Sequence, residues 1–334
     1  MNFSTPKHRR RPRLKLGEGV RAYYHLMSRT LNDEKWFGQA EKKQLQQLIR
    51  KISDFSGVTL VTYTVMDNHF HLLVEVPPER EVSNQEIVRR YGVLYPRPTQ
   101  AMPFTADALG KLLDKAEGAP KRKRPTEEES EGKFVREDLV RRMHDVSWLM
   151  KTIKQRFASS FNASRERFGP VWGQRFKSVA VEGDPKILRT VAAYIDLNAV
   201  RAELVEDPKD YPFCGYAEAL AGGKEALRGL EVLGCDLDGY RNILLEAGAD
   251  AEEGEDSEDS GQDEGTFPLR GRLQYLSDSY VLGSEEFVKE ASKSLEGLRK
   301  KPVSPKPAGP SEGLAIFPGM HRARRRRKRK SGDS

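Results

Sequence analysis

The sequence has little of what a membrane protein or a disulfide-stabilised secreted protein needs. Among its 334 residues only two are cysteine, Cys214 and Cys235, and they form no CxxC motif. This spacing argues against a zinc knuckle and a disulfide framework. No apolar run approaches the roughly 20 residues of a membrane-spanning helix, and no signal-peptide core follows the basic N-terminus. We therefore expect a soluble protein of the cytoplasm with no membrane partner.

Hydrophobic residues are also scarce for a single packed globule. They make up 37% of the chain, and the mean hydropathy is −0.68, whereas globular domains are usually about 45–50% apolar with glycine counted. A folded part with solvated tails fits this composition. The predicted division is a basic arm (1–17), a folded domain (18–220) with an insertion near 79–133, an acidic linker (221–265), a short helical segment (266–300) and a basic disordered tail (301–334).

Charge is distributed unevenly along the chain. Lysine and arginine total 57 against 50 acidic residues, for a net charge of +7, yet residues 246–265 hold ten acidic residues and no basic one. Residues 301–334 hold ten basic residues and two acidic ones. A basic body with a basic tail favours a polyanionic partner, most simply nucleic acid. The alternative is a solubility surface with a disordered tail.

The order of predicted elements indicates an α+β fold. Residues 20–30 read as a strand, 39–55 as a helix, 57–76 as a β-hairpin, 135–161 as a long amphipathic helix and 176–181 as a strand. Asp184 and Pro185 then open a helix that we expect to run through Leu197 or beyond. This β-α-β-β-α-β order predicts a ferredoxin-like antiparallel sheet with helices on one face, followed by a tyrosine-bearing helix. Within the insertion we expect two short helices, near 85–93 and 106–116, and a solvated stretch at 118–132.

His69-Phe70-His71 is the most informative local pattern. Alternate side chains of a strand share a face, so His69 and His71 lie on one side and Phe70 faces the core with Leu72. Two adjacent imidazoles can chelate one metal ion. The alternative is a pair of surface histidines on a half-exposed strand.

A tyrosine and an asparagine in the last predicted helix complete a candidate site. Tyr194 and Asn198 are four residues apart and so share one helical face. The phenol can project towards a metal, and the amide oxygen one turn later can be a third ligand. Alternatively, Tyr194 is an ordinary aromatic at the edge of the core and Asn198 a residue of the helix C-terminus.

Four sequence blocks, in order, carry a family resemblance. NHFHLLVEVP, WGQRFKSVAVEG, VAAYIDLNAVRAELV and DPKDYPFCGYAEAL resemble the HUH single-tyrosine transposases, specifically the REP-associated tyrosine transposases, over about residues 18–220. The resemblance implies a ferredoxin-like nuclease domain in which His69, His71 and Asn198 hold Mg²⁺ or Mn²⁺. It also implies that Tyr194 cuts single-stranded DNA near hairpins through a 5′-phosphotyrosine intermediate. The family often has glutamine or another polar residue where this chain has Asn198.

Basic residues and one tryptophan are candidates for DNA contact. Phosphate contacts give affinity without sequence information, and an exposed tryptophan can stack on an unpaired base. The predicted DNA-binding residues are Arg9, Arg10, Arg11, Arg13, Lys151, Lys154, Arg156, Trp172, Arg175 and Lys177. Trp172 is as easily a packing anchor.

The sequence favours the first of three functions and leaves the other two as alternatives. The first is a metal-dependent transposase that cleaves and joins single-stranded or hairpin DNA in the cytoplasm, associated with the nucleoid. The second is a hairpin DNA-binding protein that is derived from such an enzyme and does not cut. The third is a metal phosphohydrolase that uses water, for which Tyr194 would be dispensable. The sequence leaves open whether the protein is a monomer or a homodimer.

Overall fold

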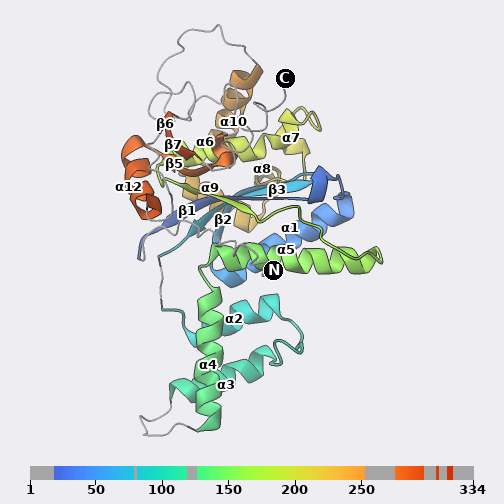
Figure 1. Cartoon of the computed structure of the whole chain (residues 1–334), viewed down its shortest axis with the longest axis vertical. Coiled ribbons are helices and arrows are strands. Elements are labelled where there is room, and N and C mark those ends of the chain that lie inside the picture. Colours follow the sequence, from blue (N-terminus) through green and yellow to red (C-terminus); the bar gives the residue numbers. More distant parts are fainter. Residues whose placement is uncertain are drawn as a thin grey trace, which may run out of the picture.

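The structure is a computed structural model that describes residues 19–78, 81–118, 126–252, 275–296, 306–307 and 314–318 (Figure 1). The predicted basic arm, residues 253–265 of the acidic block and most of the predicted basic tail lie outside the described residues. Within the described part of the chain, no helix is long and apolar enough to span a bilayer.

A four-stranded sheet organises the molecule. Its strands are β1 (Ala22–Arg29), β2 (Thr59–Val65), β3 (His69–Val76) and β4 (Lys177–Val181). Their order is β2-β3-β1-β4, and all three neighbouring pairs are antiparallel. One helix, α1 (Gln39–Ser56), connects β1 to β2, and α5 (Val146–Ser164) precedes β4. This is the ferredoxin-like β-α-β-β-α-β arrangement, so the predicted α+β fold class is confirmed.

The C-terminal segment extends this sheet by three further strands. β5 (Ser279–Gly283) pairs in parallel with β4, and β7 (Ala315–Pro318) and β6 (Lys306–Pro307) follow. The segment predicted to be helical therefore contains a strand between α11 (Tyr275–Asp278) and α12 (Glu285–Glu296). Residues 279–283 (SYVLG) form an apolar run too short for its period to separate a strand from a helix, which explains the error.

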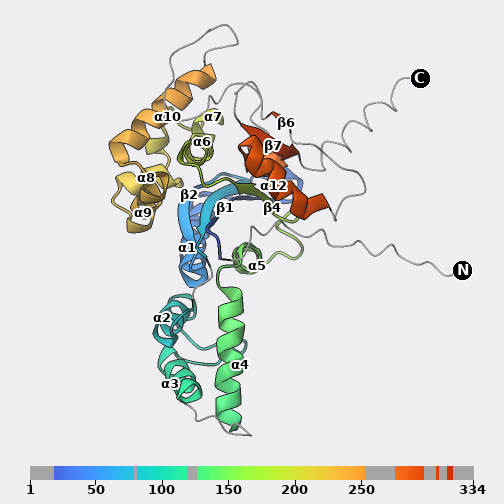
Figure 2. The same cartoon turned by 90° about the vertical axis from the view of Figure 1, so that its left-hand side faces the viewer.

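As predicted, the two ferredoxin-like helices share one face of the sheet, and the tyrosine-bearing helix is additional to them. α1 and α5 lie on one face, and α6 (Pro185–Asp196) lies on the other (Figure 2). As predicted, the Asp184 carboxylate caps α6 by accepting hydrogen bonds from the backbone N–H groups of Lys186 and Ile187. The helix ends at Asp196, slightly before the predicted end, and the four-residue α7 (Asn198–Arg201) follows.

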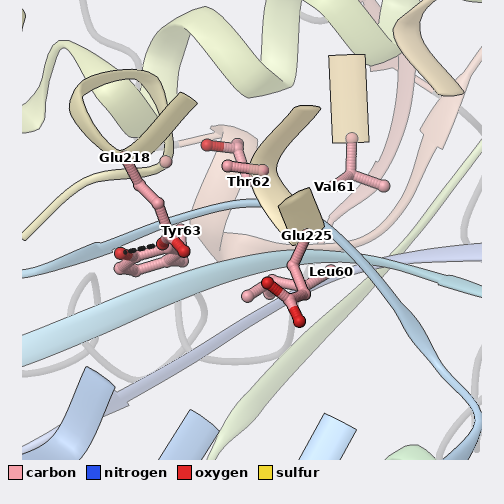
Figure 3. Close-up of a pocket in the computed structure, with 8 residues that line it drawn as sticks. Leu60, Val61, Thr62, Tyr63, Glu218 and Glu225 are labelled. Carbon is pink, nitrogen blue, oxygen red and sulfur yellow. Dashed lines mark hydrogen bonds between the residues drawn. The ribbon is translucent and has the colours of Figure 1, made fainter. Parts of the chain in front are cut away.

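Three more helices extend the α6 side of the molecule. They are α8 (Gly215–Leu220), α9 (Lys224–Leu233) and α10 (Leu237–Glu252). α8 and α9 contact strand β2 at the sheet edge, and α9 and α10 contact α6. Figure 3 shows Glu218 of α8 meeting Tyr63 of β2, whose hydroxyl donates a 2.6 Å hydrogen bond to Glu218 Oε2. α9 approaches β2 so closely that a Cβ at Gly229 would lie 2.1 Å from the Val61 carbonyl oxygen. The first part of the predicted acidic linker is thus a packed helical layer.

The predicted long helix over 135–161 is wrong, because two helices meet there. α4 (Glu127–Arg142) ends before His144, whose φ of 54° is left-handed. The Asp145 carboxylate then accepts hydrogen bonds from the backbone N–H groups of Ser147 and Trp148 and starts α5. Apolar residues continue with helical spacing across the break, so periodicity alone did not reveal it.

The insertion forms a helical arm beyond the sheet. It contains α2 (Asn84–Leu94) and α3 (Ala106–Glu117), which lie side by side with α4 away from the strands in both views (Figures 1 and 2). The stretch predicted as solvated becomes helical after Thr126, which shares a reciprocal capping box with Glu129. Both predicted short helices are present, and the arm continues to Arg142, past the predicted end of the insertion.

Candidate active site

The structure brings the two predicted histidines and the predicted tyrosine together. His69 and His71 project from β3 with ring centroids 5.1 Å apart, and the Tyr194 ring of α6 lies 5.9 Å from the His71 ring. The sheet supplies the imidazoles and the helix packed on it supplies the phenol. The three side chains are therefore close together in the folded chain.

The alternation of β3 side chains is as predicted, but the histidine face is not open. Phe70 has no exposed surface and packs on the side of α5, where its ring centroid lies 5.7 Å from that of Trp172. His71 is only 2% exposed because α6 covers its side of the sheet. The site is therefore built inside the molecule, between the sheet and α6.

A third histidine, His25, was missed by the sequence reasoning. It lies on β1, and the pairing of Met27 with His71 puts His25 on the same sheet face as His71. Its Nε2 is 2.8 Å from His71 Nδ1, and its Nδ1 is 2.7 Å from the carbonyl oxygen of Leu276. The sequence did show a lone polar residue in the apolar run of 22–27. It did not show the strand register that places this residue beside His71.

Asn68 fixes the orientation and tautomer of His69. The Asn68 side-chain N–H donates a 2.9 Å hydrogen bond to the Asp33 carbonyl, so the amide oxygen faces the His69 ring. His69 Nδ1 lies 2.6 Å from that oxygen and must donate its hydrogen to it, because an amide oxygen only accepts. In neutral His69, the other ring nitrogen, Nε2, is then left with its lone pair.

Burial keeps these histidines neutral. It lowers the pKa of His69 to about 4, with a further contribution from the Arg29 guanidinium, and lowers that of His25 to about 4. Burial also places the pKa of His71 well below its usual value. Neutral imidazoles have the lone pairs that metal ligation requires.

Tyr194 lies in an environment that both suppresses and assists its ionisation. Burial raises the pKa of its phenol, while the Arg201 guanidinium opposes that shift and a hydrogen bond with Ser277 lowers the pKa further. The Arg201 guanidinium carbon stands 4.5 Å from the Tyr194 ring centroid. The net direction is upward, so the side chain is a phenol at neutral pH, with a cation beside it to stabilise negative charge.

Arg201 is itself held in an unusual position. Its Nη2 donates to the Tyr194 carbonyl oxygen, while Nη1 is buried without a hydrogen-bond partner among the described residues. Burial lowers the pKa of Arg201 to about 10, which still leaves it charged at neutral pH. An unsatisfied cationic donor beside a phenol is well suited to an anionic group such as a phosphate.

Asn198 is anchored by its amide nitrogen at the end of α6. Nδ2 donates hydrogen bonds of 3.0 Å to the Tyr194 carbonyl and 3.1 Å to the Ile195 carbonyl. This satisfies carbonyl groups that a helix end otherwise leaves without partners. The amide nitrogen is thereby committed, and the side-chain oxygen is the atom through which Asn198 can act as a ligand.

The donor set fits an open metal site rather than a closed one. Among the described residues, no group of three or more histidine, cysteine, aspartate or glutamate side chains is placed to hold a metal ion. His69 and His71 give two adjacent nitrogen donors, which suits an ion that takes its remaining ligands as oxygen atoms from Asn198, water or substrate. The residues therefore fit a divalent metal ion that keeps open positions for a phosphate oxygen.

The predicted DNA-binding residues are dispersed around the sheet. Lys151, Lys154 and Arg156 lie on α5, on the face opposite α6 (Figure 2), whereas Lys177 contacts Asp278. Arg156 lines an open groove of about 560 Å³ together with Tyr95 and Arg97. The four predicted arginines of the basic arm, Arg9, Arg10, Arg11 and Arg13, fall outside the described residues.

The structure distinguishes two aromatic residues in the connection between α5 and β4. Trp172 donates a 2.8 Å hydrogen bond to the Lys154 carbonyl, and its ring packs at 5.5 to 5.7 Å from those of Phe37, Phe70 and Phe157. Phe168, which the sequence analysis did not select, is 95% exposed. Arg175 is also exposed. Trp172 thus serves as a packing anchor, and Phe168 is the freely accessible aromatic ring.

Comparison with known proteins gives one family match. The sequence model of the family described as "Transposase IS200 like" matches residues 19–92, which include β1, α1 and the His69-Phe70-His71 pattern. This match confirms the resemblance to IS200-like transposases for that segment. No curated protein matches the chain.

Solved structures also show similarity, and one of them aligns at low sequence identity. It is described as "Structure of the REP associates tyrosine transposase bound to a REP hairpin" and is 15% identical. The alignment covers 64% of this chain and 86% of that one, with a TM-score of 0.38.

Proposed function

We propose, from the premise that residues 19–92 carry the IS200-like transposase match, that this protein is a metal-dependent transposase acting on single-stranded or hairpin DNA. It cleaves one strand and rejoins DNA through a 5′-phosphotyrosine intermediate on Tyr194. Mg²⁺ or Mn²⁺ is the cofactor, held by His69, His71 and Asn198. The protein works in the cytoplasm, in association with the nucleoid.

The observation that carries the proposal is the approach of the Tyr194 ring to that of His71. The two rings come from β3 and α6, which are far apart in the sequence, and their centroids stand 5.9 Å apart. A phosphohydrolase that activates water has no use for a tyrosine at this position. A nucleophile beside metal ligands is instead the arrangement that covalent phosphoryl transfer requires.

The side chains have distinct roles in the reaction. The phenol oxygen of Tyr194 attacks the scissile phosphorus, the new O–P bond forms, and the bond from phosphorus to the 3′-oxygen breaks. The phenol gives up its proton and the leaving 3′-oxygen becomes a hydroxyl, so the number of phosphodiester bonds is conserved and the step can be reversed. Arg201, at 4.5 Å from the ring, stabilises the phenolate as it forms.

The two imidazoles and the amide orient the substrate. When bound, the metal ion supplies Lewis-acid polarisation of the scissile phosphate. His69 Nε2 is available to ligate it, because Nδ1 is occupied with Asn68. The Asn198 amide nitrogen is tied to the end of α6, so its oxygen and the Tyr194 phenol are carried by one turn of the same backbone.

Basic side chains on both faces of the sheet supply affinity for DNA. Lys151, Lys154, Arg156, Arg175, Lys177 and the four arginines of the arm neutralise backbone phosphates in this proposal, and Trp172 helps to shape the surface. Such contacts weaken with salt in proportion to the number of phosphates neutralised. The exposed Phe168 offers a ring on which an unpaired base can stack.

One experiment separates this function from the other two. The protein is incubated with end-labelled single-stranded hairpin DNA and Mn²⁺, with and without EDTA, beside Tyr194→Phe. We expect a covalent protein–DNA adduct that requires the metal and is lost in Tyr194→Phe. Binding without cleavage would support a non-catalytic hairpin-binding protein, and cleavage that persists in Tyr194→Phe would support a water-using phosphohydrolase.

A further inference from the structure

His25 and His71 form a buried chain of hydrogen bonds that ends on a backbone carbonyl. His71 Nδ1, His25 Nε2, His25 Nδ1 and the Leu276 oxygen follow one another, with spacings of 2.8 Å between the two rings and 2.7 Å to the carbonyl. His71 is 2% exposed, His25 is 1% exposed, and Leu276 is fully buried. Solvent therefore has little access to any member of the chain.

The carbonyl end sets the direction of every hydrogen bond in the chain. A carbonyl oxygen only accepts, so His25 Nδ1 carries a hydrogen and donates it to Leu276. A neutral His25 then has a lone pair at Nε2. His71 Nδ1 must therefore donate to His25, and His71 Nε2 is left as a lone pair.

The opposite assignment requires a buried imidazolium. If His25 donated from both nitrogens, it would carry a positive charge on a side chain that is 1% exposed. Its two hydrogen-bond partners are a carbonyl and a neutral imidazole, and neither provides a compensating negative charge. Burying an uncompensated cation costs far more than burying a neutral ring, so the neutral assignment is favoured.

We propose that His25 is a positioning residue of the metal site and that, through His25, the Leu276 carbonyl holds His71 in the tautomer whose Nε2 is free to ligate. The role in metal binding rests on the proposed metal-dependent function. His69 and His71 then present the same nitrogen, each held by a different outer partner: Asn68 for His69 and His25 for His71. Outer partners of this kind orient metal-binding histidines and fix their tautomers.

The proposal makes the C-terminal segment part of the site. Leu276 belongs to α11, far outside the residues 19–92 of the family match. The same helix provides Ser277, which is hydrogen-bonded to Tyr194, and Asp278, which contacts Lys177. One short segment thus supports both the metal-ligating face and the nucleophile.

Two substitutions of His25 distinguish a hydrogen-bonding role from simple packing. The hydrogen bonds from His71 to His25 and from His25 to the Leu276 carbonyl are called the relay below. In His25→Gln, the amide oxygen can accept from His71 and the amide N–H can donate to Leu276, so the relay is retained. In His25→Leu, both hydrogen bonds are lost while a bulky side chain still fills the site. Met27→Leu, on the same strand and sheet face, is the matched control for repacking.

The tautomers are read directly by nuclear magnetic resonance of the full-length protein with ¹⁵N-labelled histidine. The chain has six histidines, and His71→Ala identifies the His71 signals. At neutral pH without metal, we expect His25 and His71 to carry hydrogen at Nδ1 in the wild type. His71 should keep that state in His25→Gln and Met27→Leu and should populate the Nε2–H tautomer in His25→Leu.

Calorimetric titration with Mn²⁺ measures the consequence for ligation. We expect affinity to fall by about 10-fold to 100-fold in His25→Leu and to stay near the wild-type value in His25→Gln and Met27→Leu. An Nε2–H tautomer of His71 in the wild type overturns the proposal. An unchanged tautomer and affinity in His25→Leu overturn it as well.

The measurements also separate this inference from the proposed function. Should the wild type show the expected tautomers but bind no Mn²⁺ and cut no DNA, the transposase proposal fails while the hydrogen-bond relay stands. If His25→Leu does not fold, as its thermal transition will show, the wild-type tautomers and His25→Gln still decide the outcome.

Discussion

The two faces of strand β3 bury neighbouring side chains to the same degree but in different ways. Phe70 and His71 are adjacent in sequence and 0% and 2% exposed. Phe70 lies among other aromatic rings, including Trp172. His71 instead lies among groups that form directed hydrogen bonds or carry charge. Burial alone therefore does not distinguish the core from the candidate site. The number and direction of hydrogen bonds distinguish them.

The two faces also differ in which parts of the chain complete them. On the apolar face, α1 packs against α5, and both belong to the ferredoxin-like order. On the polar face, α6 supplies Tyr194, α7 supplies Arg201, and the more distant α11 supplies the Leu276 carbonyl. The apolar face should consequently govern stability, and the polar face should govern chemistry.

The largest effect is expected on the apolar face. Phe70→Ala leaves a cavity against Trp172 and should lower the free energy of unfolding by about 3–5 kcal/mol, as truncations of buried phenylalanine do. Chemical denaturation monitored by circular dichroism measures this change. Phe168→Ala, at a ring that is 95% exposed, is the matched control and should be close to neutral. Similar losses in the two variants would contradict the assignment of the apolar face.

At His69, one residue before Phe70, a substitution should lower activity by a comparable free energy while leaving stability nearly unchanged. His69→Ala removes one proposed ligand and should slow formation of the covalent adduct by about 100-fold to 1,000-fold, equivalent to about 3–4 kcal/mol of the barrier. The initial rate of adduct formation with labelled hairpin DNA at saturating Mn²⁺ measures it. Its thermal transition should remain near that of the wild type, because removing a neutral, partly exposed ring costs less packing than Phe70→Ala. Full activity in His69→Ala would contradict its role.

The polar face should make the free energy of unfolding depend on pH through His25. The folded-state pKa of His25 is about 4, below its ordinary 6.5, so its contribution to stability is present above pH 6.5 and is lost as pH falls towards 4. His25→Gln removes that dependence. The unfolding free energy of His25→Gln relative to the wild type should therefore increase by at most about 3 kcal/mol between pH 7 and pH 4.

Asp196 provides an opposite pH dependence in the same part of the molecule. Burial raises its pKa from 3.8 to about 6, so its contribution is present below pH 3.8 and is lost as pH rises through 6. Wild type and His25→Gln share this carboxylate, and it cancels in the comparison. Denaturation curves at several pH values test the prediction, and parallel curves for the two proteins would disprove it.

The smallest effect is expected from surface charge on the α5 side. Lys151→Ala should weaken binding to hairpin DNA without changing the rate of adduct formation at saturating DNA. If Lys151 neutralises one phosphate, the slope of log affinity against log salt should fall by about 1. Fluorescence anisotropy at several salt concentrations measures that slope. A change in the saturated rate would instead connect α5 to the chemistry of the opposite face.

Much of the fold followed from local signals. The alternation in 69–76, the spacing of Leu45, Ile49 and Ile52, and the Asp184-Pro185 start of α6 each predicted an element that the structure contains. The failures share a cause. The break at His144 and the strand β5 are decided by a capping side chain and by pairing with β4, neither of which changes the apolar period of the sequence.

The candidate site was predictable in part, because some of its geometry follows from local spacing. The alternation of His69 and His71 and the position of Tyr194 on a helix could be inferred from spacing. Arg201 also lies close to the same helical face in sequence spacing, seven residues after Tyr194. The participation of His25 and Leu276 could not be inferred, because it depends on strand register and on the approach of segments distant in sequence.

Sequence by itself determined which side chains are available: two imidazoles on one face of a strand, a tyrosine on a capped helix, and an excess of positive charge. Local sterics and periodicity suffice for this, since they act over a few residues. Tertiary structure decided which nitrogen of each buried imidazole is free and that α11 lies beside them. Hydrogen-bond direction depends on atoms that meet only when the sheet and α11 pack together.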